Sequence, residues 1–291
     1  MKVALLSRNP LGWVSRSLEG EFSLRGHCTR IVPIRTMVMG FLTTPIAFAG
    51  GHNLVDDFDV AVLRVLGPDS LEEALHTIGL LRFLESHGQL LVNSEVATRN
   101  CLNKLSTIDM LSASGIAVPR TFIVRHVDEG LRAFGDIGDA VIKPIFGSRG
   151  EGVTRATNVE SARFVLEEML AHGRVPLIQE FIRHEGFDIR ALVVGDVVIA
   201  SMRRESKGLR TNISRGGKPM PIELGVELSG LAVRASRALG CDYAGVDIVS
   251  SDKGNYVLEV NSQPDYRALQ CVSGVNISAS LAALVEGRAV G

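Results

Sequence analysis

Short apolar runs alternate with helical patterns in the first third of the chain, and this alternation constrains the fold more than any other feature. Residues 3–6 and 60–63 predict strands, and a helical stretch near 15–25 and a loop-rich region lie between them. Residues 70–87 predict an amphipathic helix, because their apolar side chains recur at helical spacing. Strands that alternate with helices are typical of an α/β unit with parallel pairing. We place this unit at residues 1–95.

The predicted helices and strands of the second part of the chain indicate a small central unit, which we place at residues 96–180. Its first helix is expected around residues 102–111, where leucine and isoleucine side chains recur on one face. Residues 140–144 predict a strand that runs into a glycine-rich turn, and residues 160–172 predict a helix.

The third part, residues 181–291, is rich in strands and contains one predicted helix at residues 227–239. Residues 244–250 and 255–260 predict a hairpin, because a short polar turn that ends in glycine separates two apolar runs.

The composition excludes several classes of function. The formal net charge is -1, so no strong electrostatic field points to nucleic acid or to an anionic membrane. None of the four cysteines forms a CxxC pair, and no run approaches the ~18 apolar residues that a membrane helix requires. The apolar start is too short for the core of a signal peptide. We expect a cytoplasmic protein that binds neither nucleic acid nor membrane.

A glycine-rich loop follows the strand that carries Lys143, and it contains Gly147, Ser148, Gly150 and Gly152. Glycines let the backbone approach a ligand closely, and consecutive amides in such a loop can hold phosphate oxygens. The lysine adds a positive charge beside them. Because the GxxxxGK[ST] pattern of a Walker loop is absent, the alternatives are a phosphate-binding loop of another type and a flexible surface hairpin.

Two carboxylates and an amide stand in the predicted C-terminal hairpin, at Asp247, Glu259 and Asn261. Residues two apart on a strand share a face, and pairing around the turn can bring Asp247 onto that face too. Hard oxygen donors of this kind suit Mg²⁺. A solvent-facing polar stripe is the alternative. The apolar neighbours of Glu259 favour a ligand role, since an unpaired buried carboxylate is costly.

Another predicted strand ends with Gln179, Glu180, Phe181 and Ile182. An apolar strand that ends near a carboxylate could bind adenine through backbone groups and could hold a ribose or an amine through the acid. An ordinary strand is the simpler interpretation of these residues taken alone.

Five cations stand close together beyond residue 200, namely Arg203, Arg204, Lys207, Arg210 and Arg215. Arginine holds carboxylate or phosphate through two parallel hydrogen bonds, which favours an anion clamp. Several glycines make the segment loop-like, so a solvated basic loop is the alternative.

Together these strings resemble the ATP-grasp superfamily and, within it, the RimK-like glutamate ligases. The resemblance covers nearly the whole chain. The most similar stretches are Asn93-Ser94-Glu95, Lys104-Leu105, 115–119, 188–196, Arg210-Thr211-Asn212, 215–217, 244–248 and Glu259-Val260-Asn261. The resemblance implies an ATP-grasp fold with an N-terminal α/β domain, a small central α+β domain and a C-terminal α+β domain, with ATP between the last two.

The resemblance also implies a role for each matching position. The residues expected to bind ATP are Lys104, Lys143, Gly147, Ser148, Gly150, Gly152, Gln179, Glu180, Phe181, Ile182, Asp188, Arg210 and Thr211. Those expected to act in catalysis, by holding the transferred phosphoryl group and the acyl substrate, are Arg203, Arg210 and Asn212. The expected ligands of two Mg²⁺ ions, or of Mn²⁺, are Asp247, Glu259 and Asn261. Arg190 and Asp265 are expected near the substrate.

The implied activity is that of an ADP-forming acid–amino-acid ligase. ATP would phosphorylate a carboxylate, and an amine would attack the acyl phosphate to form an amide. We expect L-glutamate as the amine and a small cofactor-like carboxylate as its partner, as in cofactor biosynthesis, with a peptide carboxylate as the other choice. The alternatives are a small-molecule kinase and a nucleotide sensor without turnover. Assembly as a homo-oligomer stays open.

One departure from the family pattern concerns the end of the metal motif. The family commonly continues as Asn-x-Ser-Pro-Gly, whereas this chain reads Asn261-Ser262-Gln263-Pro264-Asp265. A carboxylate at Asp265 would attract the ammonium group of an incoming amino acid. A turn cap after Pro264 is the competing interpretation. Residues 37–57 match no feature of the family.

Overall fold

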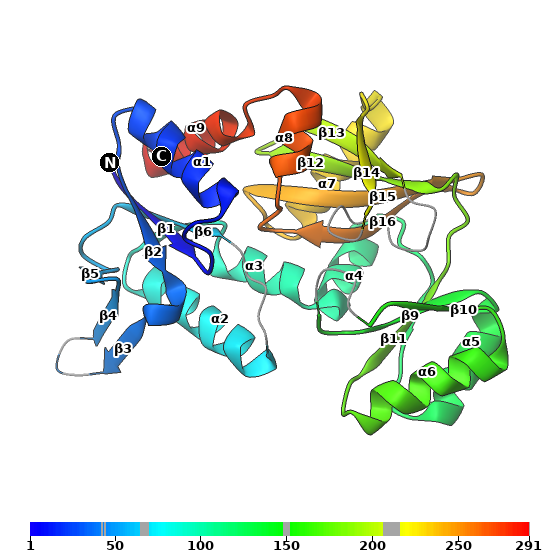
Figure 1. The fold of residues 1–291 in the computed structure, drawn as a ribbon. Helices are drawn as coiled ribbons and strands as arrows, with labels where there is room; N and C mark the ends of the chain where they lie inside the picture. Colours follow the sequence, from blue (N-terminus) through cyan, green and yellow to red (C-terminus); the bar gives the residue numbers. More distant parts are fainter. Residues whose placement is uncertain (42, 44, 65–69, 148–151, 206–215, 291) are drawn as a thin grey trace.

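The computed structural model describes residues 1–41, 43, 45–64, 70–147, 152–205 and 216–290. These residues form four β-sheets with helices packed against them (Figure 1). The order of strands and helices along the chain agrees with the predicted α/β and α+β classes.

The N-terminal sheet is parallel and has the strand order β2-β1-β6-β7. Its strands are β1 (Lys2–Ser7), β2 (Cys28–Pro33), β6 (Val60–Arg64) and β7 (Leu90–Val92), with the helices α1 (Trp13–Leu24) and α2 (Leu71–Ser86). The predicted parallel pairing is confirmed. Helix α2 begins as expected, because the Ser70 hydroxyl accepts a hydrogen bond from the Glu73 N–H at 3.1 Å.

A small antiparallel sheet occupies the region that the sequence presents as a loop. It contains β3 (Val38–Phe41), β4 (Pro45–Ala49) and β5 (His52–Asn53), and the short 3-10 helix η1 (Ile34–Thr36) precedes it. These strands have two to five residues each and no clear alternation of polar and apolar side chains. Sequence periodicity therefore carries little signal for them.

The central sheet has the order β10-β9-β11-β8 and pairs its strands in antiparallel fashion. It contains β8 (Thr121–Ile123), β9 (Ala140–Pro144), β10 (Thr154–Ala156) and β11 (Pro176–Glu180), with α5 (Val127–Ile137) and α6 (Val159–Ala171) against it. The two helices lie together at the end of the molecule farthest from the chain termini (Figure 1).

The helix expected at residues 102–111 is interrupted, and this prediction was wrong in part. The structure has α3 (Glu95–Leu102) and α4 (Lys104–Ala113), and the Asn103 side chain between them caps α4 by accepting from the Leu105 N–H at 3.0 Å. In α4 it is Thr107 and Leu111 that are buried, whereas Leu105 is 48% exposed. The cap places Lys104 at the first position of α4.

The C-terminal sheet is antiparallel and has the order β14-β13-β12-β15-β16. Its strands are β12 (Phe187–Val194), β13 (Val197–Glu205), β14 (Lys218–Pro221), β15 (Tyr243–Ser251) and β16 (Gly254–Asn261). Helix α7 (Val226–Ala238) packs on one face of it. The predicted hairpin is confirmed, with Ser251 opposite Gly254 at its turn.

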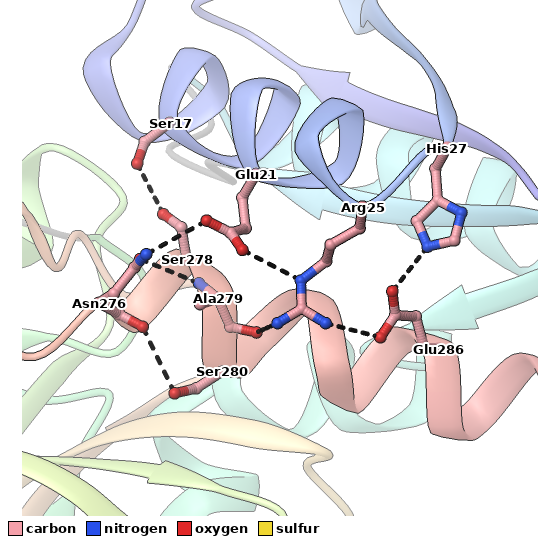
Figure 2. Close-up of polar contacts among 9 residues, drawn as sticks. All are labelled: Ser17, Glu21, Arg25, His27, Asn276, Ser278, Ala279, Ser280 and Glu286. Atoms are coloured by element: carbon pink, nitrogen blue, oxygen red, sulfur yellow. Dashed lines mark hydrogen bonds and ion pairs between the residues drawn. The ribbon is translucent and has the colours of Figure 1, made fainter.

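The chain ends in α8 (Arg267–Ser273) and α9 (Ile277–Val290), which connect the C-terminal sheet to the N-terminal one. Their apolar side chains share one core with α1, β1 and β12. Figure 2 shows the polar contacts between α1 and α9, in which Arg25 donates to Glu286 at 2.9 Å and Ser17 lies 2.7 Å from Ser278. The first and third parts of the chain are therefore held together by this helix.

None of the helices in the described ranges is, by itself, long and apolar enough to cross a membrane. Only α8 and α9 taken together pass that test by length and composition, and the pair is bent by 113°.

The shared core predicts a large stability loss when α9 is truncated at its centre. Leu281→Ala removes a side chain that is 3% exposed and should lower the free energy of unfolding by about 2–5 kcal/mol. Leu24→Ala is the matched control, because Leu24 is 86% exposed and its truncation should change stability by less than about 0.5 kcal/mol. Guanidinium unfolding curves of both variants measure this. Equal losses would mean that α9 does not carry the core.

Candidate functional site

A polar pocket opens where α4 begins, between the loop after β9 and the end of β16. Its lining residues are Thr98, Cys101, Leu102, Lys104, Gly147, Glu259, Asn261, Ser262 and Gln263. Four of these were predicted to bind ATP or metal, from three distant parts of the chain: Lys104, Gly147, Glu259 and Asn261. The fold brings them together.

Two lysines from different elements act electrostatically on Glu259, and Lys104 lines the pocket itself. The Lys104 ammonium donates to the Gly147 carbonyl at 2.6 Å, and the Lys143 ammonium on β9 donates to Oε1 of Gln179 at 3.0 Å. Burial lowers the pKa of Lys104, and it lowers the pKa of Lys143 to about 8, while the Glu259 carboxylate opposes this effect on both. Both ammonium groups are thus within electrostatic reach of Glu259, where they can stabilise an anion.

Four buried charges alternate on the C-terminal sheet next to the pocket. The Asp188 carboxylate accepts from Arg204 Nε at 2.8 Å and from its Nη2 at 2.5 Å. Arg204 Nη2 also lies 3.0 Å from Asp247 Oδ2. The Arg190 fork completes the cluster, because its Nη2 donates to Asp247 Oδ2 at 2.9 Å and its Nε donates to Oδ1. The strand register produces this, since Asp188 is paired with Arg204 and Arg190 with Asp247.

The arginines keep the Asp247 carboxylate ionised. Burial acts to raise its pKa, but Arg190 and Arg204 together hold the pKa of Asp247 below its usual value. Burial likewise opposes the charge on Arg204, and Asp247 and Asp188 outweigh it, so the pKa of Arg204 is raised. The cluster is therefore a fully charged, hydrogen-bonded network.

Glycine at position 245 leaves the space that Arg190 needs. A Cβ atom there would lie 2.7 Å from Arg190 Nη1 and 2.8 Å from the Cβ of Pro264. Both distances are too short for real contacts. The fork of Arg190 and the backbone of the loop after β16 therefore depend on the missing side chain.

The three predicted metal ligands share one face of the β15–β16 hairpin. Asp247 lies directly opposite Glu259, and Asn261 lies two residues further along β16. Among the residues that the structure describes, the buried Asn261 Nδ2 atom has no hydrogen-bond partner, as expected of a residue that faces a ligand site. Within the described ranges, no group of three or more His, Cys, Asp or Glu side chains could hold a metal by itself. Two carboxylates and an amide oxygen fit Mg²⁺ if phosphate oxygens and water supply the remaining positions.

The predicted adenine strand offers one open backbone donor. The N–H groups of Glu180 and Phe181 donate to the carbonyls of Arg120 at 2.8 Å and Asp139 at 2.9 Å. The N–H of Ile182 makes no hydrogen bond within the part of the chain that the structure describes. A contact between adenine and this segment stays a prediction, and Ile182 is its available donor.

The structure does not bring Arg203 into the charge cluster. Neighbouring residues on a strand face opposite sides of the sheet, so Arg203 faces away from the side that Arg204 shares with Asp188. Arg203 is paired with Ile189, which packs under α7. Its Nε lies 2.9 Å from Glu205, and its guanidinium lies 5.8 Å from the Phe187 ring. Arg204 occupies the position facing Asp188 instead, and alternation along β13 was the signal that could have distinguished the two arginines.

Some predicted residues cannot be placed. Ser148, Gly150, Arg210, Thr211 and Asn212 lie outside the described residues. The flanking Gly147 and Gly152 have φ angles of 142° and 67°, which only glycine adopts without strain.

Asp265 stands at the exposed end of the loop after β16. Its Oδ1 accepts a hydrogen bond from the Arg267 N–H at 3.0 Å, directly before α8. This geometry supports the turn-cap interpretation and leaves the predicted contact with substrate untested.

Sequence reasoning assigned no role to two buried residues that hold this same loop. Arg64, at the end of β6, is 1% exposed and donates to the Tyr243 hydroxyl at 3.0 Å and to the Pro264 carbonyl at 2.9 Å. The Asn93 amide donates to the carbonyls of Tyr243 at 2.9 Å and Ser262 at 2.6 Å. A lone arginine after an apolar strand was the available signal for Arg64.

A central sheet that carries Lys143, a helix that begins at Lys104 and a carboxylate hairpin from the next sheet, with Lys104 and Glu259 in a common pocket, are typical of an ATP-grasp fold. The RimK-like ATP-grasp domain matches residues 101–285. A probable alpha-L-glutamate ligase of Hahella chejuensis is 31% identical over 99% of this chain and 95% of its own length. A tetrahydromethanopterin:alpha-L-glutamate ligase of Methanosarcina acetivorans is 30% identical over 94% of this chain and 95% of its own length.

Solved structures agree on the fold. A RimK domain ATP-grasp protein of Sphaerobacter thermophilus superposes with a TM-score of 0.79 at 23% identity, over 98% of this chain and 99% of that one. The ATP-grasp ligase PsnB, complexed with a minimal precursor, Mg and ADP, gives a TM-score of 0.73 at 21% identity over 99% and 97% of the two chains. The chain belongs to the RimK-like ATP-grasp family, and it is an ATP-dependent, ADP-forming ligase.

The close approach at Gly245 predicts a specific sensitivity. Gly245→Ala should lower the free energy of unfolding by about 1–3 kcal/mol, because the new methyl group displaces Arg190 or Pro264. Gly287→Ala is the control: Gly287 lies in α9 with open space around it, and alanine there should raise stability by about 0.5–1 kcal/mol. Urea unfolding distinguishes them. A stable Gly245→Ala protein would show that Arg190 is not confined as described.

Proposed function

We propose that this ligase joins L-glutamate to a small cofactor-like carboxylate through an acyl phosphate. The observation that carries the proposal is that Lys104 lines one pocket with Glu259 and Asn261, while Lys143 on β9 lies within electrostatic reach of the same Glu259 carboxylate. Cations beside a magnesium-type donor set are what a polyphosphate requires. The names of the relatives supply the choice of glutamate.

The proposed chemistry has two steps. A carboxylate oxygen of the acyl substrate attacks the γ-phosphorus of ATP, the bond to the β,γ-bridging oxygen breaks, and ADP leaves. The amine nitrogen of glutamate then attacks the acyl carbon, the bond from that carbon to the phosphate oxygen breaks, and inorganic phosphate leaves as the nitrogen releases a proton. The amide is the product.

The chain's own residues would bind and orient the reactants. Lys104 and Lys143 would stabilise the phosphates of ATP, and Arg204 would take the part first assigned to Arg203 at the edge of the transferred phosphoryl group. Asp247, Glu259 and Asn261 would hold magnesium, as two ions or with manganese in its place; bound metal neutralises charge on the phosphates. The loop around Gly150 and the segment 210–212 keep their predicted roles.

The acceptor is inferred from the relatives. One of them is named for tetrahydromethanopterin, a small cofactor, whereas PsnB is complexed with a precursor peptide. The identity to the first is 30% and that to PsnB is 20%. We therefore favour a small carboxylate, and a peptide carboxylate is the second candidate.

The decisive test measures ADP release from the purified protein with panels of carboxylates and amino acids, followed by mass spectrometry of the products. The proposal requires ADP release that depends on both glutamate and a small carboxylate, with one glutamyl addition detected. Glu259→Gln should abolish it. ADP release without any amine would indicate a kinase, and nucleotide binding without release would indicate a sensor.

The lowered pKa of Lys143 predicts proton uptake when nucleotide binds. Above about pH 8 the ammonium loses its proton in the nucleotide-free protein, and phosphate oxygens would favour the charged form and restore it. ATP affinity should therefore fall as the pH rises past 8. Calorimetry near pH 8.5 in two buffers with different ionisation enthalpies measures the uptake. Lys143→Arg, which does not titrate there, is the control, and equal uptake in both proteins would contradict the prediction.

The two interpretations of Asp265 can be separated by two substitutions. Asp265→Asn keeps an oxygen that can accept from the Arg267 N–H and removes the charge, whereas Asp265→Gly removes both. If the carboxylate attracts the amine, both variants should raise the KM for the amino acid, by up to about fivefold for an exposed contact, with the KM for ATP unchanged. A lower Tm of the glycine variant alone, with every KM intact, would leave only the turn cap.

A further inference from the structure

The carboxylate of Asp247 is already saturated by cations before any ligand arrives. Its Oδ1 accepts from Arg190, and its Oδ2 lies within hydrogen-bond distance of both Arg190 and Arg204. Its side chain is only 5% exposed. Asp247 also does not line the pocket, whereas Glu259 and Asn261 do. Two of the three donors are thus open and the third is covered.

The two arginines differ in how firmly they are held. Arg204 is anchored twice, because it also donates through both nitrogens to Asp188. Arg190 has Asp247 as its only hydrogen-bond partner among the described residues. It is also the more accessible of the two, at 11% exposure against 4%. Arg190 is therefore the guanidinium that can leave.

The charges around the pocket disfavour a free cation. Arg190, Arg204, Lys104 and Lys143 bring four positive charges, against three carboxylates from Asp188, Asp247 and Glu259. A divalent ion that enters alone meets this excess of positive charge and must also displace an arginine fork. A metal that arrives with polyphosphate brings negative charge for the lysines and a new bidentate partner for Arg190.

We propose that Arg190 competes with the divalent metal for Asp247, so that the metal binds tightly only together with the nucleotide. The competition rests on the proposed function in one respect: the phosphates of a bound nucleotide are the partner that draws Arg190 away from Asp247. In this proposal the Arg190 guanidinium is a positioning group that keeps Asp247 ordered and ionised until metal and nucleotide bind. It also ties metal entry to substrate entry.

The test uses Mn²⁺ as the probe and the electron paramagnetic resonance signal of free Mn²⁺ as the readout, without nucleotide. Arg190→Gln should bind Mn²⁺ at least about tenfold more tightly than the wild type, because removal of a competitor restores the binding-competent fraction. The gain should vanish in Arg190→Gln combined with Asp247→Asn. Arg237→Gln is the matched control, since Arg237 pairs with Asp196 at an exposed site, and its Mn²⁺ affinity should equal that of the wild type.

Two outcomes would overturn the competition. One is an unchanged Mn²⁺ affinity in Arg190→Gln. The other is a wild-type Mn²⁺ affinity that is equally tight with and without a non-hydrolysable ATP analogue. Should melting curves show that Arg190→Gln does not fold, Arg190→Lys carries the test: it keeps the charge, loses the fork and should gain at least about threefold. Because none of these measurements requires turnover, absence of ligase activity would overturn the proposed function without affecting this result.

Discussion

Buried polar side chains join the N-terminal sheet to the hairpin that carries the candidate metal ligands, and the geometry of the site depends on this joint. Asn93 uses both ends of its amide, since its Oδ1 accepts from the N–H of Asp242 at 2.6 Å while its Nδ2 donates to Tyr243 and Ser262. Arg64 holds the next turn of the same loop. A partner lost here leaves a buried group unsatisfied, at a cost of about 1–3 kcal/mol each. The position of β16 relative to α4 is thus set from outside the C-terminal sheet.

Because side chains alternate along each strand, the C-terminal sheet has one apolar face and one charged face. Ile189 and Val246 point under α7 with the other apolar side chains of that core. Asp188, Arg190 and Asp247 point the other way, where the strand register pairs them with opposite charges. Ion pairs can be buried on this face because the Asp188 and Asp247 carboxylates each meet a guanidinium in good geometry. One residue of slip would exchange the two faces, so the apolar core itself fixes the charge cluster.

What the sequence could predict follows from the range of the interactions. The helix predicted at residues 70–87 and the β15–β16 hairpin depend on local patterns, and both were predicted correctly. The Arg64 contacts join residues 179 and 200 positions apart, and no periodicity within one element reports such a pair. The sequence did not predict the break between α3 and α4, because the apolar pattern continues across the capping residue and resembles that of one uninterrupted helix. The hairpin pattern indicated Asp247, Glu259 and Asn261, the glycine-rich loop indicated Lys143, and the family resemblance added Lys104. None of these signals showed which of two adjacent arginines faces Asp247.

The balance of positive and negative charges around the pocket explains why the arginines pair with Asp247. Burial already lowers the pKa of Lys143 to about 8, so a second uncompensated cation beside it is unfavourable, and a free metal ion would be such a cation. In the proposed competition, the arginines hold Asp247 in place of that metal without adding mobile charge, because they are covalently part of the sheet. A polyphosphate would reverse the balance in one step, since it would bring negative charge to the lysines and to Arg190 at once. The proposed competition therefore favours the metal–nucleotide complex over a free cation.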